Sequence, residues 1–195
     1  MFYLDRHRSG TQWTGERALK NKARRWVRQA TDDVFASFPV PLKGIDSDNG
    51  GEFINFAMKA WCEQREITFT RSRSYHKNDN CYVERKNGDV VRKTVGHARH
   101  TNEEALAAVY RILNPLLNYF YPRTKLIDKT RDGKGKTKKV YDQPATPYER
   151  LLARDDVGEE AKERLKAGRK RLNIVRLQDA LERAVDQLPQ TAQRY

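Results

Sequence analysis

The chain has 195 residues, with 39 Lys and Arg against 26 Asp and Glu, which gives a formal charge of +13 and a pI of about 9.8. With only two cysteines and no apolar signal-peptide core at the start, nothing suggests a disulfide-rich secreted domain. No stretch reaches the ~18 apolar residues of a membrane helix, so we expect a cytoplasmic location by default and no membrane partner. A chain this basic is usually drawn to nucleic acid, although a merely soluble basic protein is the alternative.

The first half of the chain alternates between predicted strands and predicted helices, as in an α/β fold. In chain order, we expect a hairpin over residues 2–14, a helix over 16–30, a strand over 40–45, a helix over 52–64, a strand over 67–70 and a helix from about residue 80. A helix connects the strands at 40–45 and 67–70, so these two strands are expected to pair in parallel.

The second half is predicted to be helical except for one basic stretch. Residues 103–120 have helical apolar spacing, and Pro115 is expected to kink or split this helix. Residues 123–139 hold eight Lys or Arg against two Asp and are read as an exposed basic loop. Thr146 is placed to cap a short helix that starts at Pro147, and residues 159–188 are expected to form one or two charged helices.

Two acids in the first half have a spacing that suggests chemistry. Asp48 lies just past a predicted strand, which is where open α/β sheets place their sites. Glu84 lies on a predicted helix, with 35 residues between the two acids. An acid at a strand end and an acid on a crossing helix can converge on one hard cation.

These residues resemble a known family. The segment at 47–53, SDNGGEF, is similar to the region around the second acid of retroviral integrases and related bacterial insertion-sequence transposases. The segment at 78–87, NDNCYVERKN, is similar to their third-acid region, and ITFTRSRSY at 67–75 also matches. The 35-residue spacing is the signature of this family, and the resemblance extends from about Trp13 to Arg99, more loosely to residue 148.

The resemblance implies a ribonuclease-H-like α/β core over residues 1–122, in which a mixed sheet is flanked by helices. A basic flexible segment over 123–145 and a helical, basic extension over 146–195 would follow. The implied activity is DNA transposition or integration by metal-dependent strand cleavage and transfer, with Asp48 and Glu84 as catalytic residues and metal ligands. Two Mg²⁺ (or Mn²⁺) ions are the implied cofactors.

The implied partner is DNA, both the element ends and the target, and the intact protein is expected to be a homo-oligomer. Lys77, Lys86, Arg92 and Lys93 lie in or beside the matching segments and are expected to contact DNA phosphates. For the basic stretch at 123–139, DNA contact and a plain solvated loop stay equally open.

One acid of the family pattern has no clear counterpart here. The family places its first acid on a central first strand upstream of the Asp48 segment, and the resemblance puts that strand before Met1. Asp5 is the only early acid near a predicted strand, but this strand is the wrong one. Three interpretations stay open: a core without its first acid that is inactive alone, a non-catalytic DNA-binding remnant, and a nuclease that uses Asp5.

The other polar residues in these segments have simpler explanations. We expect Asp46 to be a solvated turn acid and Glu52 to face the helix dipole. Asn78 and Asp79 are expected to cap the helix that carries Glu84.

A zinc site is not expected. His97 and His100 are three residues apart, and Cys62 and Cys81 do not have the spacing of zinc-finger ligands.

Overall fold

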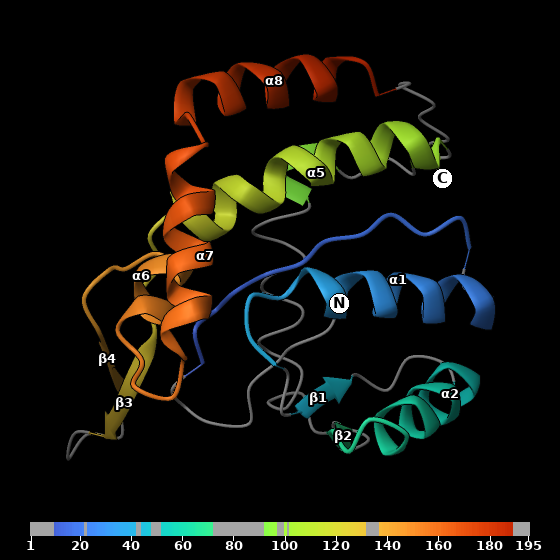
Figure 1. Ribbon diagram of the computed structural model, residues 1–195, viewed down its shortest axis with the longest axis horizontal. Helices are drawn as coiled ribbons and strands as arrows, with labels where there is room; N and C mark the ends of the chain where they lie inside the picture. Colours follow the sequence, from blue (N-terminus) through green and yellow to red (C-terminus); the bar gives the residue numbers. More distant parts are fainter. Residues whose placement is uncertain are drawn as a thin grey trace.

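The computed structural model describes residues 10–21, 23–41, 44–47, 52–71, 92–96, 100, 102–131 and 137–188, and it is a mixed α/β structure (Figure 1). A small parallel βαβ unit lies on one side of helix α1, and the longer helix α5 lies on the other (Figure 1). Helices α6, α7 and α8 follow, with an antiparallel hairpin between α5 and α6 in the sequence. In the described part of the chain, every helix is too short or too polar to cross a membrane.

The βαβ unit has the connectivity predicted from the sequence. Strands β1 (Gly44–Ser47) and β2 (Thr68–Arg71) pair in parallel, so that β1 begins opposite Thr68 and ends opposite Arg71. Helix α2 (Glu52–Glu63) connects them, as parallel strands require a crossover. The expected parallel pairing and the expected helix are therefore confirmed.

Helix α1 (Arg24–Ser37) packs on α2 and closes the core of this unit. The Phe35 ring meets the Trp61 ring edge-on, with centroids 5.1 Å apart. Trp61 Nε1 also donates a hydrogen bond to Asp32 Oδ1 at 2.7 Å, so the indole is held at both its apolar body and its polar end. The buried apolar residues of this core are Val27, Met58, Trp61, Cys62 and Ile67.

The chain turns sharply between α2 and β2. Ile67 N donates to Cys62 O at 2.9 Å and Glu66 N donates to Glu63 O at 3.3 Å, while Glu66 has a positive φ of 54°. A left-handed residue with these bonds is the usual way to end a helix, and glycine is the residue that normally occupies it. The turn brings Ile67 back onto the core beside Cys62.

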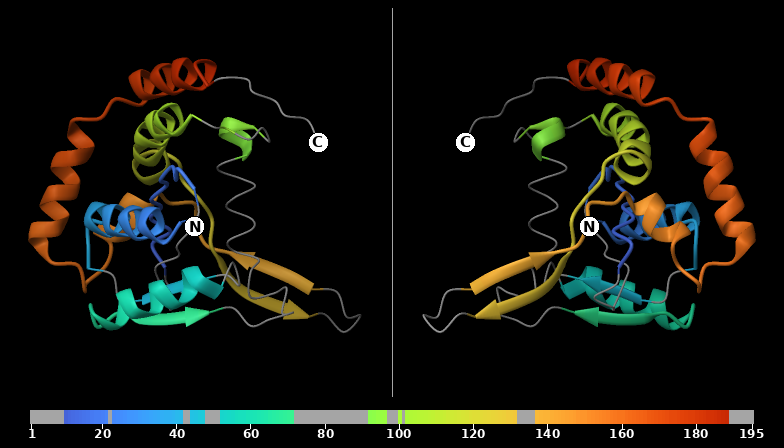
Figure 2. Two further views of the ribbon diagram at one scale, coloured as in Figure 1. Left: turned by 90° about the vertical axis from the view of Figure 1, so that its right-hand side faces the viewer. Right: turned by 90° about the vertical axis from the view of Figure 1, so that its left-hand side faces the viewer.

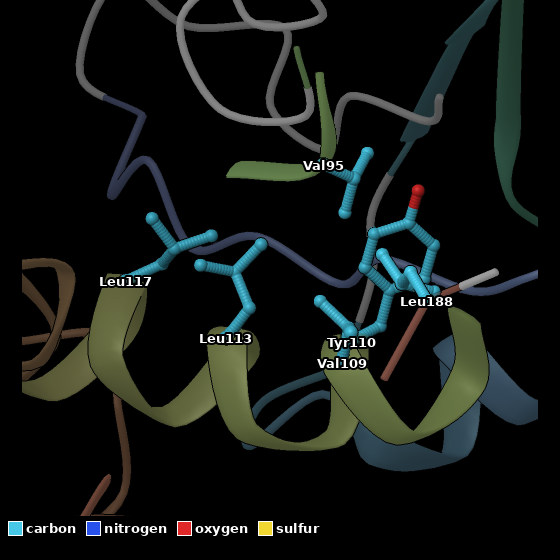
Figure 3. Close-up of a cluster of buried hydrophobic side chains, with 6 residues drawn as sticks. All are labelled: Val95, Val109, Tyr110, Leu113, Leu117 and Leu188. Carbon is cyan, nitrogen blue, oxygen red and sulfur yellow. The ribbon is translucent and has the colours of Figure 1, made fainter. Parts of the chain in front are cut away.

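Helix α5 (Glu103–Tyr119) carries the second core. Asn102 caps it by accepting a hydrogen bond from Ala105 N. Its buried side chains face Val95, from the short helix α4 (Lys93–Val95), and Leu188 near the end of the described chain (Figure 3). Pro115 lies inside one continuous helix. The expected split is therefore absent, because buried contacts of Leu113 and Leu117 hold both sides of the proline.

The predicted helix over residues 16–30 is wrong in its first half, since α1 begins only at Arg24. Residues 10–20 form neither helix nor strand and run between α5 and α1 (Figure 1). The side chains of Asn114 and Asn118 bind the backbone of Glu16 and Thr14. These long-range hydrogen bonds hold the segment in a non-helical conformation, although the apolar spacing of residues 16–30 predicted a helix there. The predicted hairpin over 2–14 is likewise not formed at residues 10–14, and residues 2–9 lie outside the described residues.

The C-terminal helices are α6 (Pro147–Leu152), α7 (Glu159–Lys170) and α8 (Ile174–Asp186). The expected cap is confirmed: Glu149 N donates to Thr146 Oγ1 and Thr146 N donates to Glu149 Oε2, which completes a capping box ahead of Pro147. Helix α8 packs on α5, so residues at the end of the chain share a core with Val109.

The exposed basic loop predicted for residues 123–139 is a paired structure instead. Strands β3 (Leu126–Arg131) and β4 (Thr137–Tyr141) form an antiparallel hairpin that extends away from the helices (Figure 2). Its strands are exposed along almost their whole length, so the predicted exposure is correct. The two strands are ordered because they are hydrogen-bonded to each other and because the base of the hairpin is fixed.

Candidate nucleic-acid and metal site

The structure supplies the frame for the first acidic site residue. Strand β1 ends at Ser47, directly before Asp48, and its parallel partner β2 ends opposite it at Arg71. Both strands therefore direct their carboxyl ends to one edge of the sheet. The basic sequence segment 71–77 starts at this same edge. In the sequence, Asp48 follows β1 and the basic segment continues from β2, and the carboxyl edge of such a sheet is where open α/β sheets bind ligands.

Most of the predicted site residues lie outside the described residues. These are Asp48, Glu84, Lys77 and Lys86. Asp46 lies within β1, where its backbone is paired with Thr70.

Arg92 and Lys93 are described, and both are exposed at the start of α4. Two residues further on, Val95 is buried against α5. This buried anchor fixes the position of α4 on the surface, where both cationic side chains are exposed.

No group of three or more His, Cys, Asp or Glu side chains that could hold a metal occurs among the described residues. Cys62 is fully buried, and burial raises the pKa of its thiol to about 11. Its sulfur is therefore protonated near neutral pH. His100 Nε2 is hydrogen-bonded to Val95 O at 2.7 Å. The carboxylates Asp48 and Glu84 have the hard oxygen chemistry that Mg²⁺ requires.

The hairpin β3–β4, which we call the basic ribbon, has two different faces. Lys129 lies directly opposite Lys139, and Arg131 lies opposite Thr137. Because opposed residues and next-but-one residues share a face, one face has three cations and no acid. We call it the cationic face. The opposite face has Asp128, Thr130, Lys138 and Val140.

The three cations of the cationic face are exposed. None of Lys129, Arg131 and Lys139 is ion-paired to another residue in the part of the chain that the structure describes. Like charges directly opposite in a sheet are destabilising. The pair Lys129–Lys139 therefore produces a repulsion that a bound polyanion would relieve.

The base of the ribbon is fixed to α6 by a network centred on Asp142. Asp142 Oδ1 accepts from Lys125 N at 2.5 Å, and Asp142 Oδ2 accepts from Arg150 Nη1 at 2.5 Å. Arg150 Nη2 also donates to Arg123 O at 2.8 Å, which joins the arginine of α6 to the start of the ribbon. The hydrogen bond from Arg150 lowers the pKa of Asp142, and the Lys125 amide acts in the same direction.

Sequence reasoning missed the strands of the ribbon and the role of Asp142 and Arg150. The signal for the strands was present, because β-favouring Ile127, Val140 and Tyr141 flank a glycine-rich turn sequence at 132–135, DGKG. The high charge led to the prediction of a loop. No local pattern marks the Asp142–Arg150 pair, since both residue types are ordinary on surfaces.

Comparison with known proteins gives one relative of unstated activity. The uncharacterized protein y4rM of Sinorhizobium fredii (strain NBRC 101917 / NGR234) is 38% identical over 143 residues, which are 72% of this chain and 41% of that protein. The chain thus spans less than half the length of this relative. No family model matches the chain, and no solved structure matches it.

Proposed function

We propose that this chain is part of a DDE-type transposase or integrase and that it acts on DNA through a divalent-metal site at the carboxyl edge of β1 and β2. One observation carries the proposal. The D-x35-E acid pair begins one residue after β1, in a strand, helix and parallel-strand frame that suits it. A ribonuclease-H-like core is the proposed architecture around this frame.

The arrangement of charge around this edge supports DNA as the substrate. Asp48 follows β1, and the basic segment 71–77 follows from β2, whose last residue is paired with Ser47. A phosphodiester needs cations at its oxygens and a divalent metal at its reacting phosphate. Elsewhere on the chain, Arg92 and Lys93 are exposed and add positive charge.

Asp48 and Glu84 would hold the metal ions. Mg²⁺, when bound, supplies activation of the attacking water or 3′-hydroxyl and stabilisation of the leaving oxygen. The family pattern has three acids, and these 195 residues have clear counterparts of two. We therefore propose that these residues alone bind metal and DNA without transferring strands.

A second candidate function is a non-catalytic DNA-binding role. The exposed cationic face of the ribbon favours it, because that face can bind DNA whether or not a metal site is complete. The two candidate functions differ in whether Asp48 and Glu84 bind a metal ion in solution. Under the second candidate, neither acid affects metal binding.

Manganese titration of the full chain, followed by the electron paramagnetic resonance signal of free Mn²⁺, separates these candidates. The proposal predicts that D48N and E84Q each weaken Mn²⁺ binding, whereas D46N, which changes a neighbouring acid, leaves it intact. Equal Mn²⁺ binding by all four proteins would overturn the metal site. A DNA nicking assay on the same proteins and on D5N is expected to be negative. Nicking that is lost in D5N as well as in D48N would assign the missing role to Asp5.

A further inference from the structure

We infer that the cationic face of the β3–β4 ribbon is a docking arm for duplex DNA, placed along the major groove with Lys129, Arg131 and Lys139 at the phosphates. This inference deepens the proposed function and rests on it for the choice of DNA as the polyanion. The shape of the ribbon, the asymmetry of its faces and its attachment to the body each favour such an arm.

Shape favours a groove in a duplex. The ribbon is two strands wide, and it projects from the helices with both faces in solvent (Figure 2). Strands in a pair are about 4.8 Å apart, and the major groove of B-form DNA, about 12 Å wide, admits such a ribbon. The major groove of duplex RNA is deep and narrow and does not.

The distribution of charge gives the ribbon an orientation. The cationic face has Lys129, Arg131 and Lys139, whereas the opposite face has Lys138 together with the acid Asp128. A purely solvated ribbon has no reason to collect three of the four cations of its two strands on one side, where Lys129 and Lys139 repel each other. A row of phosphates along that side compensates for this repulsion.

The attachment of the ribbon makes it a directed arm. At its base, Arg123 and Ala145 form an antiparallel bridge, and the Asp142 carboxylate joins the Lys125 amide to the Arg150 guanidinium. Arg150 belongs to α6, whose Leu151 is buried in a core with Leu165 of α7. The ribbon therefore has a fixed origin on the body while its cations stay exposed.

The test measures binding of the full chain to a fluorescein-labelled DNA duplex by anisotropy. Two single variants form a matched pair, because K139Q and K138Q remove the same charge from adjacent exposed residues of one strand on opposite faces. Counterion release predicts that each lost phosphate contact weakens binding about eightfold at 0.1 M salt and reduces the salt slope by ~0.9. K139Q is expected to show these changes, K129Q/K139Q roughly 50-fold weaker binding, and K138Q a small change.

The outcomes separate the inference from the proposed function. Equal effects of K138Q and K139Q, or none from the double variant, would overturn the docking arm while leaving the metal site at Asp48 to its own Mn²⁺ test. Absence of DNA binding by the unaltered chain would overturn both. Equal competition by duplex RNA or single-stranded DNA of the same sequence would contradict the groove assignment. Thermal unfolding of each variant checks that the fold is intact.

Discussion

Asn118 of α5 makes a two-point hydrogen-bonded pair with the backbone of Thr14. Asn118 Oδ1 accepts from Thr14 N at 2.8 Å, and Asn118 Nδ2 donates to Thr14 O at 2.7 Å. One helical turn earlier, Asn114 makes the same pair with Glu16, at 2.8 and 3.0 Å. Two amides at helical spacing thus bind alternate residues of the N-terminal segment, as a neighbouring strand would. This segment is thereby secured to α5 without a sheet.

Replacement of Asn118 with alanine is expected to destabilise the chain markedly. Thr14 and Asn118 are only 6% and 3% exposed, so the variant removes these hydrogen bonds from a buried amide and a buried carbonyl, at about 1–3 kcal/mol each. We expect a loss of about 2–4 kcal/mol in urea unfolding. N114A, which removes the same pair at a more accessible position, should cost less. A loss below about 0.5 kcal/mol for N118A would contradict the role of this pair.

Replacement of Glu66 with glycine is expected to raise stability. Glu66 has a positive φ at the end of α2, and left-handed backbone costs a residue with a Cβ about 1–2 kcal/mol. Glycine removes this cost but loses more chain entropy on folding, so the expected net gain is about 0.5–1 kcal/mol. Q64G is the control, since Gln64 has no positive φ and glycine there should reduce stability. Urea unfolding gives the free energy of unfolding of each protein. A value for E66G below that of the wild type would contradict the left-handed conformation of Glu66.

The Asp142–Arg150 pair is expected to make a pH-dependent contribution to stability. Arg150 lowers the pKa of Asp142 in the folded chain. The stabilisation is therefore complete above the ordinary value of 3.8 and is lost as the pH falls through the lower folded value. The Arg150 side chain is only 14% exposed and that of Asp142 is 22% exposed, so D142N should cost about 2–3 kcal/mol at neutral pH, as expected for loss of a hydrogen bond between charged groups.

Urea unfolding of the wild type and D142N at neutral pH and near pH 3 tests this sign. The difference between the two proteins should shrink toward acid, because the wild-type carboxylate is then partly protonated. D156N is the control. Its partner Arg154 lies in a more exposed pair, and such pairs contribute only about 0.2–1 kcal/mol. A difference between wild type and D142N that grows toward acid would show that the sign is wrong.

Sequence patterns predicted those elements whose signals are local. The parallel pairing of β1 and β2, the helix between them and the Thr146 cap each follow from neighbouring residues. The late start of α1 could not be predicted, since it depends on Asn114 and Asn118 about 100 residues away. The strands of the ribbon were not predicted because a high density of charge is typical of loops, although β-favouring residues lie at the ends of the ribbon. For the candidate site, the sequence predicted the parallel strands that precede Asp48 and the basic segment 71–77, while the cationic face depends on strand register.

The most direct test of the account is the salt dependence of DNA binding by the full chain, measured by anisotropy with several duplexes of unrelated sequence. The central claim is that an exposed, basic surface binds the phosphate backbone. Several phosphate contacts should then give a roughly hundredfold or greater loss of affinity between about 50 and 200 mM salt, similar for each duplex. Failure to bind at the lower salt concentration, or an affinity that does not change across this range, would contradict the claim.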